Sequence, residues 1–420
     1  MMNYVIVGNS AAGLSAAEAI RQNDAAGNIT IVSDEKYEAY SRPLISYYLK
    51  NKVTKQQMLL RTPDWCKEQN VTLLYETTAE KIDPKSKKVK LSDGKSLSYD
   101  KLLLANGSIP FVPPVEGLNG QDNVFTFMDL KSSEEIRTFA KPEMKAVVIG
   151  GGLIGMKAAE GLSKICASVT VLELAPRILP TILDDDGSRL VEQTLEQHSI
   201  ICRVGDTAAT VNGEKTVQSL TLKSGETIPC DLLVMAVGVR PNTALAKSAG
   251  CQIDRGVLIG ECAETSVENI YAAGDVAQGC DVLDGKKKIL ALWPMAVMQG
   301  KTAGCAIAGA DACYKGAFAV NAIDFFGLRI STCGITDTEE DGFTVLKKRD
   351  DKTYRKFFCK DGLLKGYILI GDISRAGIYT TLVREGIAIE KLGGTAIFDS
   401  PEMIQLPADV RDDLLNGGVS

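Results

Sequence analysis

The first 35 residues alternate short apolar runs with one amphipathic segment. The apolar run Tyr4–Val7 leads into a glycine-bounded turn at 8–13, and an alanine-rich stretch of helical pattern follows. A second apolar run, Ile29–Val32, is followed closely by two acids, Asp34 and Glu35. A strand, a glycine turn, a helix, a second strand and an acid are the sequence form of a dinucleotide-binding βαβ unit.

The same pattern recurs 142 positions later, counted from Gly8 to Gly150. There the apolar run 146–149 enters a second glycine turn at 150–155, and a helix and a strand lead on to Glu173. One such turn is weak evidence, because glycine turns are common. Two copies, each with an acid 18 to 21 residues after its last glycine, predict two nucleotide sites.

The remaining pattern divides the chain into domains. Residues 81–100 alternate like short strands with Asp-Gly turns, and 102–110 and 232–242 are each an apolar strand that ends in glycine and proline. We expect these two segments to carry the chain between domains. Beyond 318, alternating runs at 354–358 and 364–370 and a helical pattern at 376–391 indicate a third domain.

We therefore predict an α/β fold with two Rossmann-like dinucleotide-binding domains and a small α+β C-terminal domain. The predicted boundaries are 1–112 and 241–317 for the first domain, 113–240 for the second and 318–420 for the third.

Composition narrows the class of protein. The formal charge of 47 − 53 = −6 over 420 residues argues against nucleic acid as a partner. The uncharged segment 1–17 is broken by glycines, so we expect no membrane span. The eleven cysteines form no CxxC motif and fit a reducing cytoplasm, and the single histidine, His198, is expected at an exposed helix end. We expect no metal site.

Both turns are expected to bring backbone N–H groups and a helix N-terminus to a pyrophosphate. In the first turn Ser10 replaces the middle glycine, and either Asp34 or Glu35 is expected to bind an adenosine ribose. The predicted residues are Gly8, Ser10, Ala11, Ala12 and Gly13 in the first turn, and Gly150, Gly152, Leu153, Ile154, Gly155 and Glu173 in and after the second.

A further motif runs an apolar strand into Gly274-Asp275. Together GNSAAG, LLLANGSIP, GGGLIG, AVGVRPN and NIYAAGDVA resemble the pyridine nucleotide-disulfide oxidoreductase family over about residues 1–315. Within it the chain is most similar to the NADH:rubredoxin oxidoreductases and the flavin module of nitrite reductases. The resemblance implies FAD in the first domain, NAD(H) in the second, and hydride transfer between them.

The resemblance also assigns residues to the cofactors. It implies that Asp275 binds the ribityl chain of FAD and that Arg42, in the segment YSRPLIS, reaches the FAD phosphate or ribose. The other implied contacts are Pro43, Ala79, Asn106, Gly107, Gly274 and Trp293 for FAD, and Gly238 for NAD. Trp293 has the alternative of a buried aromatic at a helix start.

The departures from the family are informative. The CxxxxC of disulfide reductases is absent, and Ser46 stands where related oxidases and coenzyme A-disulfide reductases carry one redox cysteine; we expect Cys66 to be a buried structural residue. Related ferredoxin reductases pair a lysine and a glutamate beside the flavin, at positions held here by Tyr47 and Lys157. The candidate catalytic residues are Ser46, Tyr47 and Lys157, which are expected close to the flavin. Lys157 either faces the flavin as a lone cation or lies on the helix surface.

The expected function is a cytoplasmic, FAD-dependent NADH oxidoreductase that exchanges electrons with a ferredoxin- or rubredoxin-like protein, or with an iron–sulfur subunit of a larger complex. The C-terminal domain would serve dimerisation, in a homodimer or hetero-oligomer, or partner docking, and Lys286–Lys288 form either a solvated hairpin tip or a docking patch. The alternatives are an NADH oxidase, peroxidase or coenzyme A-disulfide reductase-like enzyme, and a non-catalytic NADH-binding redox sensor.

Overall fold

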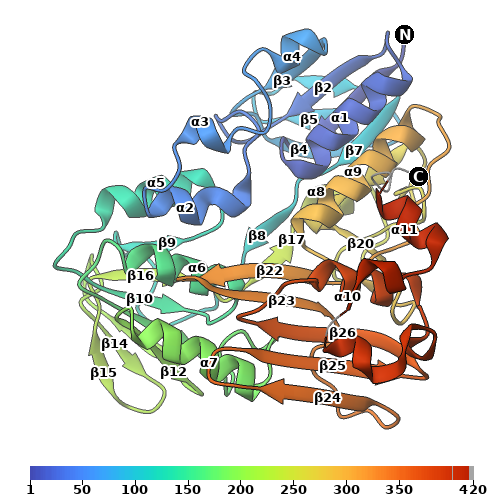
Figure 1. Cartoon of the computed structure of the whole chain (residues 1–420). Coiled ribbons are helices and arrows are strands. Elements are labelled where there is room, and N and C mark those ends of the chain that lie inside the picture. Colours follow the sequence, from blue (N-terminus) through green and yellow to red (C-terminus); the bar gives the residue numbers. More distant parts are fainter. Residues whose placement is uncertain (400, 416–420) are drawn as a thin grey trace.

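The computed structural model of the chain describes residues 1–399 and 401–415. Its core is a pair of parallel sheets with a separate antiparallel sheet beside them (Figure 1). This confirms the predicted α/β class with two Rossmann-like domains and a C-terminal α+β domain.

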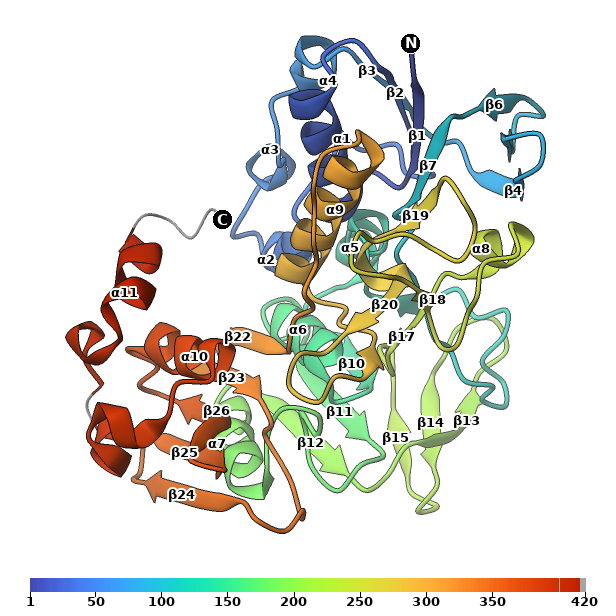
Figure 2. The ribbon, with the colours of Figure 1, turned by 90° about the vertical axis from the view of Figure 1, so that its right-hand side faces the viewer.

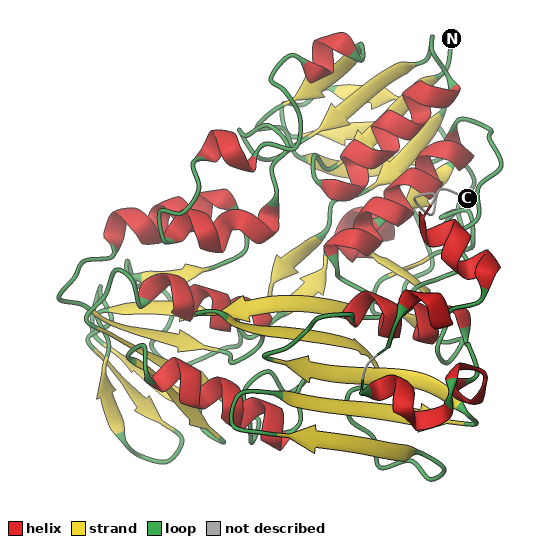
Figure 3. Cartoon of the chain, viewed as in Figure 1, coloured by secondary structure: helices red, strands yellow, loops and turns green. Residues whose placement is uncertain are grey.

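The first parallel sheet has the strand order β19-β7-β1-β2-β3. Its strands are β1 (Asn3–Val7), β2 (Asn28–Val32), β3 (Val71–Leu74), β7 (Lys101–Leu104) and β19 (Ile270–Ala272). Helices α1 (Ala11–Asn23) and α9 (Trp293–Ile307) lie side by side against it (Figure 3). Their close packing requires glycine at position 300, because a Cβ there would lie 2.2 Å from the carbonyl oxygen of Ala12. Late segments of the chain therefore complete the first domain.

The second parallel sheet has the order β12-β11-β10-β16-β9. Its strands are β9 (Val124–Thr126), β10 (Lys145–Ile149), β11 (Ser168–Glu173), β12 (Ile200–Val204) and β16 (Leu232–Met235). Its helices are α5 (Leu130–Phe139), α6 (Leu153–Leu162) and α7 (Asp185–Glu196). Strand β10 is fully apolar after its first residue and buried on both faces, as a central parallel strand requires.

Smaller elements surround the two domains. Antiparallel sheets are formed by β4 (Ala79–Asp83), β5 (Lys88–Leu91) and β6 (Ser96–Ser98), and by β13 (Ala208–Asn212), β14 (Ser219–Leu222) and β15 (Thr227–Pro229). A third small sheet holds β18 (Val257–Leu258), β20 (Ala277–Cys280) and β21 (Lys287–Lys288). Short helices are η1 (Arg42–Leu44), α2 (Ile45–Leu49), α3 (Lys55–Met58), α4 (Trp65–Glu68), α8 (Ala244–Ser248) and η2 (Gly274–Val276).

The two predicted crossings between domains lie against each other. Strand β8 (Ser108–Pro110) follows β7, β17 (Val239–Pro241) follows β16, and the two pair antiparallel with Ser108 opposite Pro241. The chain thus leaves the first domain and returns to it through one two-stranded ribbon.

The C-terminal domain is a five-stranded antiparallel sheet of order β22-β23-β26-β25-β24. Its strands are β22 (Val320–Phe325), β23 (Leu328–Gly334), β24 (Thr344–Arg349), β25 (Tyr354–Lys360) and β26 (Leu363–Ile370). Helix α10 (Ala376–Glu385) packs on β26, and η3 (Ile389–Leu392), η4 (Gly394–Phe398), η5 (Met403–Gln405) and α11 (Ala408–Leu415) follow.

The other face of this sheet packs against the second domain. Ile330, Tyr354 and Ile370 share one hydrophobic core with Leu183 and Val191 of the second domain. Figure 2 shows the C-terminal sheet beside α7, on the side of the molecule away from β4 and β6. The C-terminal domain is therefore attached chiefly to the nucleotide domain that contains α7.

The structure corrects two predictions, one helix end and the exposure of one residue. The helix expected at 376–391 ends at Glu385, because Gly386 takes a left-handed φ of +59° that terminates it. His198 is half-buried after α7 and stacks on Phe326, with ring centroids 3.8 Å apart, so it is not an exposed helix end. The domain boundaries stay predictions, and 400 and 416–420 of the predicted third domain lie outside the described residues.

Candidate active site

The first glycine turn joins β1 to α1 and requires two residues that lack a side chain. Gly8 has a φ of +118°, and a Cβ there would lie 2.2 Å from the carbonyl oxygen of Ala105. A Cβ on Gly13 would lie 1.9 Å from the carbonyl oxygen of Gly8. Real Cβ atoms do not approach so closely, so both positions require glycine.

The second turn repeats this geometry between β10 and α6. Gly150 has a φ of +111°, and its Cβ would lie 2.2 Å from the carbonyl oxygen of Ala236. A Cβ on Gly155 would lie 1.9 Å from the carbonyl oxygen of Gly150. Two stretches of different sequence therefore form the same turn, because the same close contacts dictate glycine at the same places.

Each turn ends at the N-terminus of a helix that has no side-chain cap. Ser10 is the N-cap of α1 and Gly152 is the N-cap of α6, and neither position makes a capping hydrogen bond through a side chain. The first N–H groups, at Ala11–Gly13 and Leu153–Gly155, therefore lack intrahelical partners and point out of the helix. Together with the helix dipole they suit the pyrophosphate of a dinucleotide.

Glu173 is fixed against the second turn. Its Oε2 accepts a hydrogen bond of 2.6 Å from the N–H of Gly151, and its Oε1 accepts one of 2.8 Å from the N–H of Ala175. A Cβ on Gly151 would lie 2.9 Å from the Cβ of Glu173. The carboxylate is thus held where a ribose acid is needed, at the tip of β11 beside the glycine turn.

The structure distinguishes the two acids after β2. Glu35 forms an ion pair with Arg42 and accepts a 2.7 Å hydrogen bond from the hydroxyl of Tyr40. Asp34 is exposed at the strand tip. The predicted contacts Glu35 and Arg42 are therefore brought together. Burial raises the pKa of Asp275, and the charge of Arg42 opposes this rise.

Asp275 lies in η2 at the end of β19. Burial raises the pKa of this carboxyl, although a 2.9 Å hydrogen bond from Ser108 and the charge of Arg42 both oppose the shift. Gly274 has a φ of +79°, and its N–H donates to Oε1 of Gln299 at 2.9 Å. Gln299, a buried polar residue of α9 that orients this turn, was missed by the sequence analysis.

The residues around the first turn fit FAD. Two of their buried polar atoms, Nδ2 of Asn9 and Oδ1 of Asn106, have no hydrogen-bond partner among the described residues. The carboxyl of Asp275 is also largely removed from solvent. Buried polar groups normally have partners, and a ligand rich in hydroxyl, amide and phosphate groups would supply them here. Asn9 had no role in the sequence analysis, but its position between two predicted site residues is a usable signal.

The other predicted contacts lie around these two turns. Pro43 is the second residue of η1, Ala79 is the first residue of β4, and Gly107 and Gly238 take left-handed φ values of +64° and +121° just before β8 and β17. Trp293 begins α9 and packs, half-buried, against the core of the first domain. Trp293 does start a helix, but it is only half-buried, so the alternative of a buried aromatic is not met, and its flavin contact stays a prediction.

Ser46 is buried at the start of α2, and its hydroxyl donates to the carbonyl oxygen of Pro43 at 3.5 Å. Cys66 is half-buried in α4, not fully buried as expected, and burial, followed by the charge of Glu38, raises the pKa of its thiol. All eleven cysteines are free thiols. A buried hydroxyl thus occupies the position at which the sequence resemblance predicts a redox thiol in related oxidases.

Lys157 does not lie on the surface of α6. Its side chain is 16% exposed, and Nζ donates to Oε2 of Glu160 at 2.6 Å and to the carbonyl oxygen of Asp324 at 2.8 Å. It also lies 5.4 Å from the centroid of the Tyr47 ring. The surface alternative is therefore wrong, and Lys157 is not a lone cation either, because it is paired with Glu160. A contact between Lys157 and the flavin stays a prediction.

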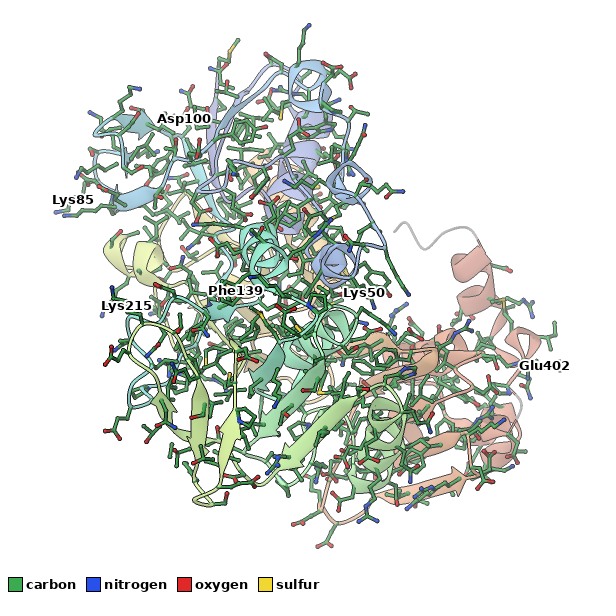
Figure 4. The ribbon with its side chains drawn as sticks, turned by 90° about the vertical axis from the view of Figure 1, so that its left-hand side faces the viewer. Lys50, Lys85, Asp100, Phe139, Lys215 and Glu402 are labelled. Carbon is green, nitrogen blue, oxygen red and sulfur yellow. The ribbon has the colours of Figure 1, made fainter. Side chains whose placement is uncertain are left out.

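Glu160 is shared by a second lysine. Lys50 Nζ lies 2.7 Å from Oε1 of Glu160, and the two side chains are 3% and 4% exposed. Figure 4 labels Lys50 where α2 meets α6. Burial alone would raise the pKa of Glu160, but hydrogen bonds from Lys157 and Lys50 hold it below its usual range. We call these three residues the Lys50–Glu160–Lys157 cluster.

The cluster joins the first domain, the second domain and, through Asp324, the C-terminal domain. The sequence analysis missed Lys50 and Glu160, although each lies three residues, or about one helical turn, beyond a position that it examined, Tyr47 or Lys157. The Tyr47 ring also lies 4.6 Å from Lys50 Nζ. An ion pair is therefore present between these helices, one turn further along both.

Two of the three lysines at 286–288 make ion pairs or hydrogen bonds within the protein. Lys287 donates to the carbonyl oxygen of Ile259, and Lys288 forms ion pairs with Asp281 and Asp284. Lys286 is exposed. These contacts favour the hairpin interpretation over a docking patch.

The chain has two parallel sheets, and each has a glycine turn followed by an acidic residue near the end of its next strand. This arrangement is typical of oxidoreductases that bind two dinucleotides. Residues 2–300 match the family model of the pyridine nucleotide-disulphide oxidoreductases, and 320–387 match that of the rubredoxin NAD+ reductase C-terminal domain. The chain belongs to the pyridine nucleotide-disulphide oxidoreductase family, and its cofactors are FAD and NAD(P)H. The predicted family and cofactors are confirmed.

Relatives of known name share most of the chain. The NADH oxidase of Methanocaldococcus jannaschii is 35% identical over 320 residues, which are 74% of this chain and 71% of that protein. Subunit epsilon of the NADH-dependent phenylglyoxylate dehydrogenase of Aromatoleum evansii is 31% identical, covering 90% and 91%. The structure of NADH:rubredoxin oxidoreductase from Clostridium acetobutylicum superposes with a TM-score of 0.78 at 26% identity, covering 94% and 98%.

The described residues form neither a membrane-spanning helix nor a metal-binding cluster. None of the helices in 1–399 and 401–415 combines the length and the apolar character needed to cross a membrane. Over the same residues, no group of three or more His, Cys, Asp and Glu side chains is arranged to hold a metal ion.

Proposed function

We propose that the chain is a cytoplasmic, NADH-preferring reductase that transfers electrons between NADH and a small iron–sulfur or rubredoxin-like protein. The observation that carries the proposal is the C-terminal domain. It matches the C-terminal domain of rubredoxin NAD+ reductases and packs on the second domain through a continuous core. The proposal includes assembly as a homodimer or with an iron–sulfur subunit, and the free thiols fit a reducing compartment.

Different residues would bind FAD and NADH. The first turn, Arg42 and Asp275 would hold FAD, and the second turn and Glu173 would hold NADH. FAD, when bound, accepts a hydride from NADH and releases electrons one at a time. Ser46 supports transfer to another protein, since its hydroxyl cannot store electrons as a thiol does.

The test compares protein acceptors with oxygen. We expect NADH to reduce a ferredoxin or a rubredoxin at least tenfold faster than it reduces oxygen, because position 46 carries a hydroxyl and not a thiol that peroxide could oxidise to a sulfenic acid for the flavin to reduce in turn. Anaerobic and aerobic steady-state rates measured on the same holoenzyme decide the question. Oxygen turnover that equals the best protein acceptor would favour the oxidase function instead.

NADH should be preferred to NADPH. The Glu173 carboxylate, held by the N–H groups of Gly151 and Ala175, can accept hydrogen bonds from the ribose hydroxyls of NADH and repels a 2′-phosphate. We expect a ratio of kcat/KM values of at least tenfold, or about 1.4 kcal/mol. The measurement is initial rates with each nucleotide and ferricyanide as acceptor, and equal values would refute the assignment of Glu173.

A further inference from the structure

The loop after β11 follows Glu173, the residue that we propose binds the ribose of NADH. The N–H of Ala175 donates to Glu173, and the N–H of Leu179 donates to the carbonyl oxygen of Gly151 at 2.8 Å. Arg177 lies between these two anchored residues, and it is the only cationic residue between Glu173 and Asp184 in the sequence. A cation in this loop is what a 2′-phosphate needs, so its direction matters for the choice of nucleotide.

The side chain of Arg177 contacts the start of α7 and the C-terminal domain. Its Nε donates to the carbonyl oxygen of Leu183 at 2.9 Å, its Nη1 lies 3.2 Å from Asp185, and its Nη2 lies 2.8 Å from Oδ2 of Asp337. The side chain is 22% exposed. All three nitrogens are therefore used, and two carboxylates compensate the charge.

Asp337 belongs to the C-terminal domain, just after β23, 160 residues from Arg177. Two further ion pairs connect the same two segments. Asp184 pairs with Lys356 at 2.7 Å, and Asp186 pairs with Arg349 at 2.9 Å. The Arg177–Asp337 bond is thus one of several ion pairs between the loop–α7 segment and the C-terminal domain, and it involves the loop that follows Glu173.

We propose that Asp337 is a specificity-determining residue for the pyridine nucleotide, because it holds the Arg177 guanidinium away from the 2′ position of the adenosine ribose. The inference rests on the proposed use of NADH by the second domain. Without this carboxylate, Arg177 can rotate toward the ribose and pair with a 2′-phosphate, which offsets the repulsion from Glu173. The C-terminal domain then contributes to NADH selectivity as well as to partner binding.

The test is Asp337→Asn in the full-length holoenzyme, with ferricyanide as acceptor so that the natural electron partner is not needed. We expect the NADPH:NADH ratio of kcat/KM values to rise about tenfold, and the Kd of NADP+ measured by titration calorimetry to fall by a similar factor. Both gains should shrink as salt increases, because the new contact is between charges at a partly exposed site.

Two further variants separate this explanation from a general loosening of the interface. Adding Arg177→Ala to Asp337→Asn should return the ratio to the wild-type value. Asp341→Asn, which makes the same charge change at an exposed position on the same segment, should not alter it. An unchanged ratio in Asp337→Asn, or a gain that survives Arg177→Ala, would overturn the inference. A wild-type enzyme without NADH preference would instead refute the proposed function.

Discussion

Replacing Asp275 with alanine is expected to yield a protein that purifies without flavin. The carboxyl lies in η2, hydrogen-bonded to Ser108 and near the charge of Arg42, and burial has already raised its pKa. Hydrogen bonds donated by the hydroxyl groups of a ligand would offset the desolvation free energy of this carboxylate. Alanine offers no acceptor for them. Flavin occupancy, measured from the ratio of absorbance at 450 and 280 nm, should fall at least tenfold.

Flavin affinity should also depend on pH in a defined direction. In the flavin-free protein the pKa of Asp275 is raised above its usual value, whereas donors from bound flavin favour the ionised form. Binding therefore releases a proton at pH values below the raised pKa. Affinity should weaken as the pH falls through that range and level off above it, as a fluorescence titration of the apoprotein can measure.

A matched control is Asp281→Asn. Asp281 is a buried carboxylate six residues away that pairs with Lys288 and is not among the predicted flavin contacts. This variant should lose stability but keep its flavin. If Asp275→Ala retains full flavin occupancy, the assignment of the Gly274-Asp275 motif to FAD binding is wrong.

The glycine turns were predictable because their requirements are local. Gly13 must lack a Cβ because of the carbonyl oxygen of Gly8, five residues earlier, and Gly155 has the same relation to Gly150. A short window of sequence therefore contains both partners of each contact. The parallel sheets follow from the same windows, because the flanking strands are continuous apolar runs.

Contacts between domains were not predictable in this way. Glu160 meets a lysine 110 positions earlier, and Arg177 meets Asp337 160 positions later. Nothing in the sequence near either residue states how α2 packs on α6, or which strand end of the C-terminal sheet reaches the ribose loop. His198 was misplaced for the same reason, since its burial comes from Phe326 in another domain.

Glu160→Gln should cause the largest loss of stability among the variants considered. The substitution leaves the ammonium groups of Lys50 and Lys157 buried without a carboxylate, at the point where three domains meet. Breaking a buried ion pair by removing one partner typically costs about 3–5 kcal/mol. Urea unfolding of the holoenzyme, followed by circular dichroism and flavin fluorescence, measures the loss.

The triple variant Lys50→Met, Glu160→Leu and Lys157→Met tests whether the loss comes from the uncompensated charges. It removes all three charges and keeps similar volumes, so it should recover most of the stability, since apolar replacements of buried ion pairs are often neutral or stabilising. Glu135→Gln is the surface control, because its 3.9 Å pair with Lys131 is solvent-exposed and should contribute less than about 0.5 kcal/mol. A Glu160→Gln protein as stable as Glu135→Gln would show that water or a side-chain rearrangement compensates the two lysines, and the cluster would then not hold the three domains together.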